Sequence, residues 1–295
     1  MVRALAHAKL NLHLEILGRR PDGYHELHSL FQTIDLHDRL ELSAADGPLR
    51  LRVFPADAVM GVAADNLVLR ALESLRAAFK VREGAAARLW KRIPVGAGLG
   101  GGSSDAAAAL LAGVRLWGLD ASPARLRALA AKLGADVPFF LRGGAAWMGG
   151  RGDRVLSRGT LPDFLAVVVY PGFPVSSRAA FEALEIPLTR RFRKPSLNHY
   201  SWAACAGTKH VYNGTNAFEP MLRSQFSRMA EIQRELAATG ACGIRVTGSG
   251  SAIFGVVPDL RTARALHLRV RRAGYECWIV RPVQYGVEFP GPGTD

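Results

Sequence analysis

The chain has 295 residues, 49% of them hydrophobic, so it is long enough for two domains that each bury a core. Its formal net charge is +13 at pH 7, which fits nucleic acid, a membrane surface or a small polyanionic substrate as a partner. Only six of the 38 basic residues are lysine, and no basic run is interleaved with aromatic residues. Single-strand binders show such interleaving, so we expect no nucleic-acid partner.

The sequence also lacks the apolar segments of membrane and secreted proteins. No run of about 18 apolar residues occurs, and the start, MVRALAHAKLN, contains no apolar leader. The three cysteines, Cys205, Cys242 and Cys277, are too scattered for a disulfide framework or a metal cluster. This usage is typical of a reducing compartment, so we predict a cytoplasmic protein with no membrane partner.

The first predicted element is a long strand over residues 2–17, where apolar and polar residues alternate. The apolar positions share one buried face, and a shift of one residue would bury every charge. Lys9 and Asn11 therefore project side by side from the polar face. A solvated strand face is the ordinary interpretation of such residues, and a functional role is the alternative.

The next elements lead to the centre of the sequence. A strand is predicted near residues 39–42, and residues 49–54 are predicted as its hairpin partner. Apolar residues at helical spacing predict a helix over residues 66–80. Residues 86–93 form the strand that precedes a glycine-rich loop.

This loop runs from Pro94 to Ser104 and reads PVGAGLGGGSS, with five glycines among eleven residues. Glycine costs conformational entropy, so the cluster indicates special backbone angles or a close approach of another group. Ser103 and Ser104 stand where helix N-caps are expected, before strong helix formers at 106–117. Several N–H groups and the positive end of a helix dipole then point at one spot, which predicts a phosphate site.

Two familiar phosphate-binding motifs do not match the loop. A Walker A loop has lysine directly after its last glycine, where Ser103 stands here. The dinucleotide fingerprint needs an acidic residue after a second strand, whereas Asp120 falls in a predicted helix–helix turn. A flexible linker is the other alternative, but the flanking strand and helix favour the phosphate site.

A second candidate residue follows the next helix. Ser122 and the proline after it give a clear start signal for a helix over 123–133. Asp136 comes directly after this helix. In the simplest interpretation Asp136 caps the short turn at 138–141, and a role in chemistry is the alternative.

The second half of the chain has a different order of elements. From residue 159 it resembles the split βαβ pattern of ferredoxin-like domains. Residues 185–215 are basic and interrupted by proline, so we expect an irregular insertion there. The tail, residues 286–295, is expected to be disordered. We therefore predict an α+β protein with domains over 1–158 and 159–295.

Three separated stretches resemble the three signature regions of the GHMP kinases. They are AHAKLNLHLEILGRRPDGYHELHSLFQTIDLHDRL, then PVGAGLGGGSSDAAAAL with GADVPFF, then VTGSGSAIFG. The resemblance spans nearly the whole chain. It implies a GHMP-kinase-like two-domain fold, with an ATP-binding N-terminal βαβ-type domain, a ferredoxin-like C-terminal domain and the active site in the cleft between them.

Within this superfamily, AKLNL, RPDGYHEL and FQTIDLHD resemble the branch that acts in the non-mevalonate isoprenoid precursor pathway. The resemblance implies an ATP-dependent kinase that phosphorylates the 2-hydroxyl of a cytidine diphosphate-linked methylerythritol, with Mg²⁺ accompanying ATP. The partner is then a small-molecule substrate, a cytidine diphosphate-linked polyol. We expect a monomer or a weak homodimer.

The resemblance also implies roles for single residues. Lys9 and Asp136 match the family's catalytic pair, with Asp136 as general base and Lys9 neutralising charge on the transferred phosphoryl group. Asn66 and Lys91 would lie near the adenine. The residues expected to bind the ATP phosphates are Pro94, Val95, Gly96, Ala97, Gly98, Leu99, Gly100, Gly101, Gly102, Ser103 and Ser104.

By the same resemblance, Tyr24 and His25 lie around the cytosine, where a tyrosine ring can stack and a histidine can read the polar edge. Phe181 would form the other side of the sandwich. Asn11 would join Lys9 near the substrate. The family motifs leave the metal ligands unassigned.

Two other functions compete with this one. A GHMP kinase for homoserine, mevalonate or a sugar has the same three regions, but those substrates offer no base for the GYH stretch to stack on. The net charge alone suggests a nucleic-acid-binding protein.

Two residues depart from the family pattern. Ala217 stands where aspartate is common, and Glu182 stands where some relatives have a basic residue. Substrate contacts from the second domain are therefore less defined than the catalytic pair.

Overall fold

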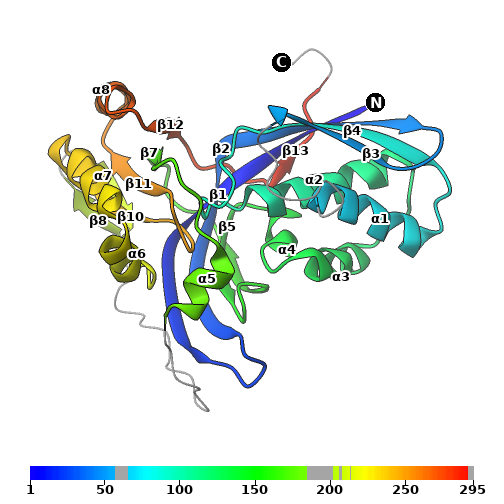
Figure 1. Cartoon of the computed structure of the whole chain (residues 1–295), viewed down its shortest axis with the longest axis horizontal. Helices are drawn as coiled ribbons and strands as arrows, with labels where there is room; N and C mark the ends of the chain where they lie inside the picture. The colour runs from blue at the N-terminus through cyan, green and yellow to red at the C-terminus, as the bar shows by residue number, and fades with distance from the viewer. Residues whose placement is uncertain (57–65, 185–201, 206–207, 213, 292–295) are drawn as a thin grey trace.

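Figure 1 shows the computed structural model of the chain, which describes residues 1–56, 66–184, 202–205, 208–212 and 214–291. The larger sheet has seven strands in the order β13-β1-β2-β4-β3, with β5 paired to β2 and β6 to β5. The strands are β1 (Val2–Arg19), β2 (His25–Ala45), β3 (Arg50–Phe54), β4 (Gly84–Trp90), β5 (Ala145–Gly149), β6 (Arg154–Gly159) and β13 (Val287–Glu288). The long antiparallel hairpin of β1 and β2 is its centre.

Four helices cover one face of this sheet (Figure 1). They are α1 (Leu67–Phe79), α2 (Gly101–Leu116), α3 (Pro123–Leu133) and α4 (Val137–Phe140). The alanines at positions 106–109 of α2 are fully buried, and their small side chains let this helix pack closely on β1 and β2. Leu72 and Leu75 of α1 and Phe139 of α4 are also fully buried in this core.

The second sheet has four strands in the order β10-β11-β7-β12, and all neighbours are antiparallel. This half comprises β7 (Leu165–Tyr170), α5 (Ser177–Glu182), α6 (Glu219–Gln225), α7 (Ser227–Ala238), β10 (Cys242–Val246), β11 (Ile253–Val257), α8 (Leu260–Arg272) and β12 (Glu276–Val280). Ile232 and Leu236 of α7 and Leu266 of α8 are fully buried in its core. The ferredoxin-like prediction is therefore confirmed.

The chain ends return to the first sheet. β13 pairs with β1, with Leu5 opposite Glu288, so the expectation of a disordered tail is wrong for this strand. Residues 292–295 lie outside the described residues. The boundary between 158 and 159 remains a prediction, and β13 extends the sheet of the first domain although it falls in the second segment.

The predicted insertion over 185–215 lies mostly outside the described residues, which omit 185–201, 206–207 and 213. Within it, β8 (Trp202–Cys205) and β9 (Thr208–Tyr212) pair as a two-stranded antiparallel sheet. The expectation of irregular structure is wrong for these two strands.

Further local predictions are wrong for identifiable reasons. Both faces of β1 are buried, because the glycine-rich loop and the segment around Thr215 pack against its polar face. β3 pairs in parallel with β4, which lies between β3 and β2, so it is no hairpin partner of β2. Helix α2 begins at Gly101 after a left-handed Gly100, so Ser103 and Ser104 lie inside its first turn and do not cap it.

The structure describes two of the three cysteines in detail, Cys242 and Cys277, and helices whose length and polarity bear on membrane insertion. Cys242 is disulfide-bonded, which the scattered cysteines of the sequence did not predict. Cys277 is a buried free thiol, and burial raises its pKa to about 11. None of the helices described is long and apolar enough to cross a bilayer.

Candidate active site

A cavity of about 550 Å³ lies between the two halves of the chain. Strand β1 and the glycine-rich loop line it from the first half, and Phe181, Gly248 and Ser249 line it from the second. The predicted cleft is therefore present. Of the predicted site residues, it brings together Lys9, Asn11, Asn66, Lys91, Asp136, Phe181 and residues 94–103.

Lys9 reaches the floor of the cavity from β1, and its side chain is only 4% exposed. The ammonium group donates to the carbonyl of Gly98 at 2.9 Å and to the side-chain oxygen of Asn11. Its Nζ lies 3.7 Å from Oδ2 of Asp136. Burial lowers the pKa of Lys9 below its usual range, and the Asp136 carboxylate opposes part of this shift. Three oxygen atoms thus hold a buried cation at one position.

Asp136 stands at the N-cap position of α4, where the simplest interpretation of the sequence put it. Its carboxylate makes no capping hydrogen bond, however, and its side chain is 27% exposed at the cavity. Capping therefore does not explain why an acid stands here. The carboxylate is open to a ligand and adjacent to Lys9.

Asn11 holds Lys9 in place while it lines the same cavity. Its side-chain oxygen accepts from Lys9, and its side-chain NH₂ donates to the hydroxyl of Ser29 at 2.9 Å. Its backbone N–H donates to the hydroxyl of Thr247 at 2.9 Å. These bonds fix the orientation of the amide, and through it the ammonium group of Lys9.

The glycine-rich loop ends in the N-terminus of α2, a helix of 16 residues. In an α-helix the N–H groups of the first turn, here those of Gly101, Gly102 and Ser103, have no intrahelical acceptor. Together with the helix dipole they form an anion site on the cavity wall. Ser104 differs from the rest of the loop, because its side chain is fully buried and its N–H donates to the carbonyl of Gly100.

Lys91 lies directly after β4, between two buried carboxylates that sequence reasoning missed. Its ammonium donates to Asp105 at 2.6 Å and also to Asp38. Asp38 accepts in addition from the backbone N–H of Ile93 at 2.9 Å, which fixes the start of the glycine-rich loop to β2. Asn66 is the N-cap of α1, and its side chain accepts from the N–H of Val68 at 2.9 Å.

The two carboxylates beside Lys91 are not equivalent. Oδ1 of Asp105 is buried and has no hydrogen-bond partner among the described residues. Burial raises the pKa of Asp105 to about 8, Asp38 adds to the shift, and Lys91 opposes it. Burial also lowers the pKa of Lys91, but the two carboxylates outweigh burial and raise it above its usual range.

The predicted cytosine contacts lie at the turn between β1 and β2. His25 stacks on Phe181, with ring centroids 5.3 Å apart. A base between these two rings would need about 7 Å, or two contacts of about 3.5 Å, so the base cannot enter there without movement. Tyr24 is 54% exposed, and the guanidinium carbon of Arg151 lies 4.5 Å from the centroid of its ring.

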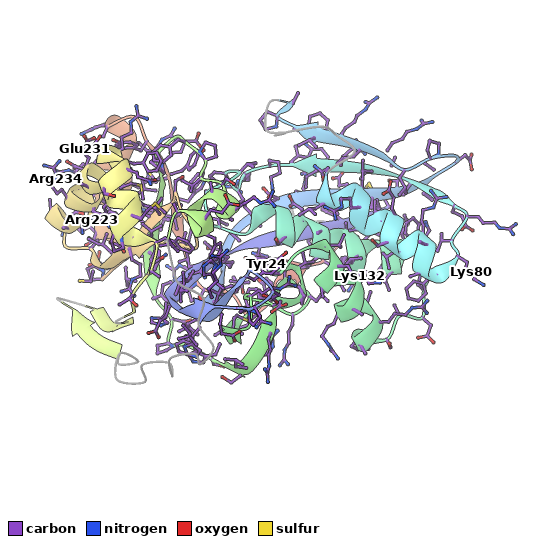
Figure 2. All side chains as sticks on the ribbon, turned by 60° about the horizontal axis from the view of Figure 1, so that its bottom comes forward. Tyr24, Lys80, Lys132, Arg223, Glu231 and Arg234 are labelled. Atoms are coloured by element: carbon purple, nitrogen blue, oxygen red, sulfur yellow. The ribbon has the colours of Figure 1, made fainter. Side chains whose placement is uncertain are left out.

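In Figure 2, Tyr24 lies in the middle of the view. Helices α6 and α7, which carry Arg223, Glu231 and Arg234, lie to its left, and Lys80 lies to its right.

Burial lowers the pKa of His25, and the charge of Arg19 adds to the shift. The imidazole of His25 is therefore neutral near pH 7, with one donor and one acceptor.

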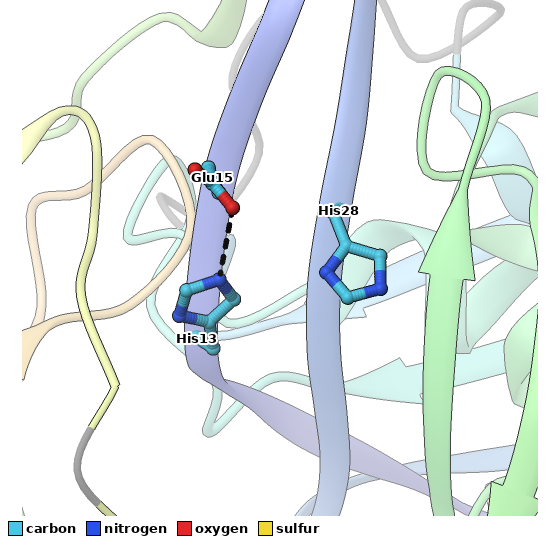
Figure 3. A group of neighbouring side chains, drawn as sticks. All are labelled: His13, Glu15 and His28. Carbon is cyan, nitrogen blue, oxygen red and sulfur yellow. Dashed lines mark ion pairs between the residues drawn. The ribbon is translucent and has the colours of Figure 1, made fainter. Parts of the chain in front are cut away.

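A second polar cluster lies on the same hairpin (Figure 3). His13 and Glu15 of β1 and His28 of β2 each offer a possible metal-ligand atom, and these atoms lie within 4.8 Å of one another. However, Nδ1 of His13 accepts the N–H of Thr215 at 3.2 Å, which puts the ring proton of the neutral imidazole on Nε2, the nitrogen that faces Glu15. A metal-bound histidine instead donates from its second ring nitrogen. We therefore assign no metal to this cluster.

The raised pKa of Asp105 predicts a pH dependence of stability. The folded state binds this proton more tightly than the unfolded state does, so the stabilisation is complete below about pH 4 and is lost as the pH rises through about 8. Asp105→Asn removes this titration. Between about pH 4 and pH 8, the free energy of unfolding of the variant should therefore fall less than that of the wild type. The difference in slope is at most about 1.4 kcal/mol per pH unit. Urea denaturation of both proteins at several pH values checks this, and parallel profiles would contradict it.

The chain matches two family models. The model described as "GHMP kinases N terminal domain" matches residues 66–144, and that described as "GHMP kinases C terminal" matches residues 199–276. A 4-diphosphocytidyl-2-C-methyl-D-erythritol kinase of Pelotomaculum thermopropionicum is 43% identical over 95% of this chain and 98% of its own length. One of Solibacter usitatus is 39% identical over 96% of this chain and 90% of its own length.

Solved structures give the same result. A crystal structure of 4-(cytidine 5'-diphospho)-2C-methyl-D-erythritol kinase superposes with a TM-score of 0.79 at 36% identity, over 95% of this chain and 98% of that one. A homoserine kinase of Cytophaga hutchinsonii superposes with a TM-score of 0.70 at 17% identity, over 98% and 97% of the two chains, and shows the fold alone. The chain belongs to the GHMP kinases and, within them, to the 4-diphosphocytidyl-2-C-methyl-D-erythritol kinase family.

Proposed function

We propose that the chain transfers the γ-phosphoryl group of ATP to the 2-hydroxyl of 4-diphosphocytidyl-2-C-methyl-D-erythritol, in the non-mevalonate route to isoprenoid precursors. The observation that carries the proposal is the Lys9–Asp136 pair on the cavity floor, in the same cavity as the N-terminus of α2. Relatives named for this substrate match nearly the whole chain, which supports the same substrate here.

The catalytic step needs a proton acceptor and a positive charge close to the transferred group. Asp136 accepts the proton of the attacking hydroxyl as general base. Lys9 pairs with Asp136 and neutralises charge that develops on the phosphoryl group. Lys9 is desolvated and held by Gly98 and Asn11, so little reorganisation is needed when the charge develops.

The nucleotide lies along the glycine-rich loop. The N–H groups at the start of α2 hold its phosphates, and the adenine lies toward Asn66 and Lys91, which line the same cavity. Lys91 cannot move freely toward the phosphates, because Asp38 and Asp105 both hold its ammonium group. We therefore assign Lys91 to the adenine end of the site.

Mg²⁺ accompanies ATP in this proposal, and the side chains at the loop suit it. Ser103 lines the cavity at the start of α2 and offers a hydroxyl, an oxygen donor of the kind that Mg²⁺ prefers. When bound, the ion neutralises charge on the phosphates. Ser103 is the residue that would hold it.

The cytidine end lies at the turn between β1 and β2. Tyr24 stacks on the base, and the neutral His25 reads its polar edge. Phe181 supports His25 through the ring stack and contacts the base from the other side once the cavity opens. Asn11 contacts the substrate in the same place where it holds Lys9.

Asp136→Asn tests the catalytic pair. This change keeps the size of the side chain and removes the base, so turnover of 4-diphosphocytidyl-2-C-methyl-D-erythritol should fall roughly 10²–10⁴-fold, with little change in substrate affinity. An ADP-release assay measures the effect, and the exposed Asp120→Asn is the matched control. Near-normal turnover of Asp136→Asn would remove this residue from the mechanism.

Gly102→Val tests the phosphate site. A β-carbon on Gly102 meets only Leu67, at 3.6 Å, so the fold should tolerate it, whereas one on Gly101 would lie 2.8 Å from Ile93. The valine enters the cavity at the start of α2, and the KM for ATP should rise at least about tenfold, the equivalent of one charge-assisted hydrogen bond. Gly159→Val, at a position with open space, is the control for stability. An unchanged KM would place the phosphates elsewhere.

His25→Phe tests how the base is read. The new ring can still stack on Phe181, but it has no nitrogen to hydrogen-bond the base. The preference for cytidine diphosphate over uridine diphosphate, measured by calorimetry, should fall about tenfold or more. Tyr24→Leu should weaken both ligands about equally, because stacking does not read the edge of the base. If His25→Phe kept the full preference, another group would have to read the base.

A further inference from the structure

The turn between β5 and β6 brings a cation to the cavity. Of the described residues that line the cavity, Lys9, Lys91 and Arg151 have positively charged side chains. Lys9 lies beside Asp136, and Lys91 is held between two carboxylates. Arg151 is different, because its guanidinium is about one-third exposed and its acidic partner, Asp153, lies two residues away on the same turn.

Arg151 lies between the two ends of the proposed substrate. Its guanidinium carbon is 4.5 Å from the centroid of the Tyr24 ring, at the cytidine end. The next residue, Gly152, lies beside the catalytic end, since a β-carbon added to it would be 3.7 Å from Oδ1 of Asp136. This short turn therefore reaches from Tyr24, where the cytosine is expected, to Asp136, the expected general base.

A cytidine diphosphate-linked polyol carries its two phosphates between the base and the sugar alcohol. With the base at Tyr24 and the reacting hydroxyl at Asp136, the diphosphate lies beside this turn. An arginine suits two adjacent phosphates, because its planar guanidinium can stack on an aromatic ring and still donate from its N–H edge. Asp153 accepts from the side chain of Arg151 at 3.3 Å and from its backbone N–H at 3.1 Å, which orients the guanidinium.

We propose that Arg151 binds the diphosphate bridge of the substrate and so selects for nucleoside diphosphate-linked acceptors. This inference rests on the proposed function. Arg151 has only a weak structural role, since the side chains of its ion pair with Asp153 are each about one-third exposed, and such pairs contribute little to stability.

Arg151→Gln tests the proposal with two probes that differ only in the phosphates. Calorimetry measures the binding of cytidine diphosphate and of cytidine to both proteins. Compared with the wild type, the variant should bind cytidine diphosphate roughly 10–100-fold more weakly and cytidine with unchanged affinity. The KM for the full substrate should rise while the KM for ATP stays constant. Arg151→Lys should restore part of the loss, because it restores the charge without the planar fork.

Arg154→Gln is the matched control, since it removes the same charge from an exposed position on the same hairpin. Equal weakening of cytidine and cytidine diphosphate by Arg151→Gln would overturn the proposal and leave Arg151 as a support for Tyr24. An unchanged preference for the diphosphate would also overturn it while the proposed function stands. If the wild type itself bound cytidine diphosphate no better than cytidine, the diphosphate site and the proposed substrate would both be wrong.

Discussion

The buried ammonium group of Lys9 is the interaction on which the site depends. A positive charge in a protein interior is costly unless oxygen atoms surround it. Here the carbonyl of Gly98, the amide of Asn11 and the carboxylate of Asp136 come from three separate segments and meet at this one charge. Placing the lysine therefore also places the glycine-rich loop and the acid relative to β1, which is the geometry that phosphoryl transfer requires.

Close backbone contacts hold the two halves of the chain together at this point. A β-carbon on Gly98 would lie 2.1 Å from the carbonyl oxygen of Thr247, and one on Gly248 would lie 2.8 Å from that of Gly98. Both glycines also have positive φ. Side chains at either position would separate the loop from the second half. The three stretches that resemble the family's signatures thus form one contact in space, which explains why all three are needed for one active site.

The sequence predicted the elements whose pattern is local. The helix formers after the glycine-rich loop and the order of strands in the second half are present in the structure. The pairing of Lys9 with Asp136 joins distant segments, and only the family resemblance predicted it. The burial of the polar face of β1 was not predicted, because the residues that cover it, such as Thr215, lie about 200 residues away in the sequence. Asp38 and Asp105 were missed because they lie on β2 and α2, whereas Lys91, which contacts both, follows β4. The stack of His25 on Phe181 also joins distant segments, so periodicity cannot reveal it.

The most direct measurement is ADP release with a panel of acceptor alcohols at one enzyme concentration. The panel contains 4-diphosphocytidyl-2-C-methyl-D-erythritol, methylerythritol phosphate, homoserine and mevalonate. A cavity that binds the cytidine and its diphosphate uses that remote binding energy to position the reacting hydroxyl. The predicted result is rapid ADP release with the cytidine diphosphate-linked alcohol and very slow release with the other three. Equal or faster release with homoserine, mevalonate or methylerythritol phosphate would contradict the account.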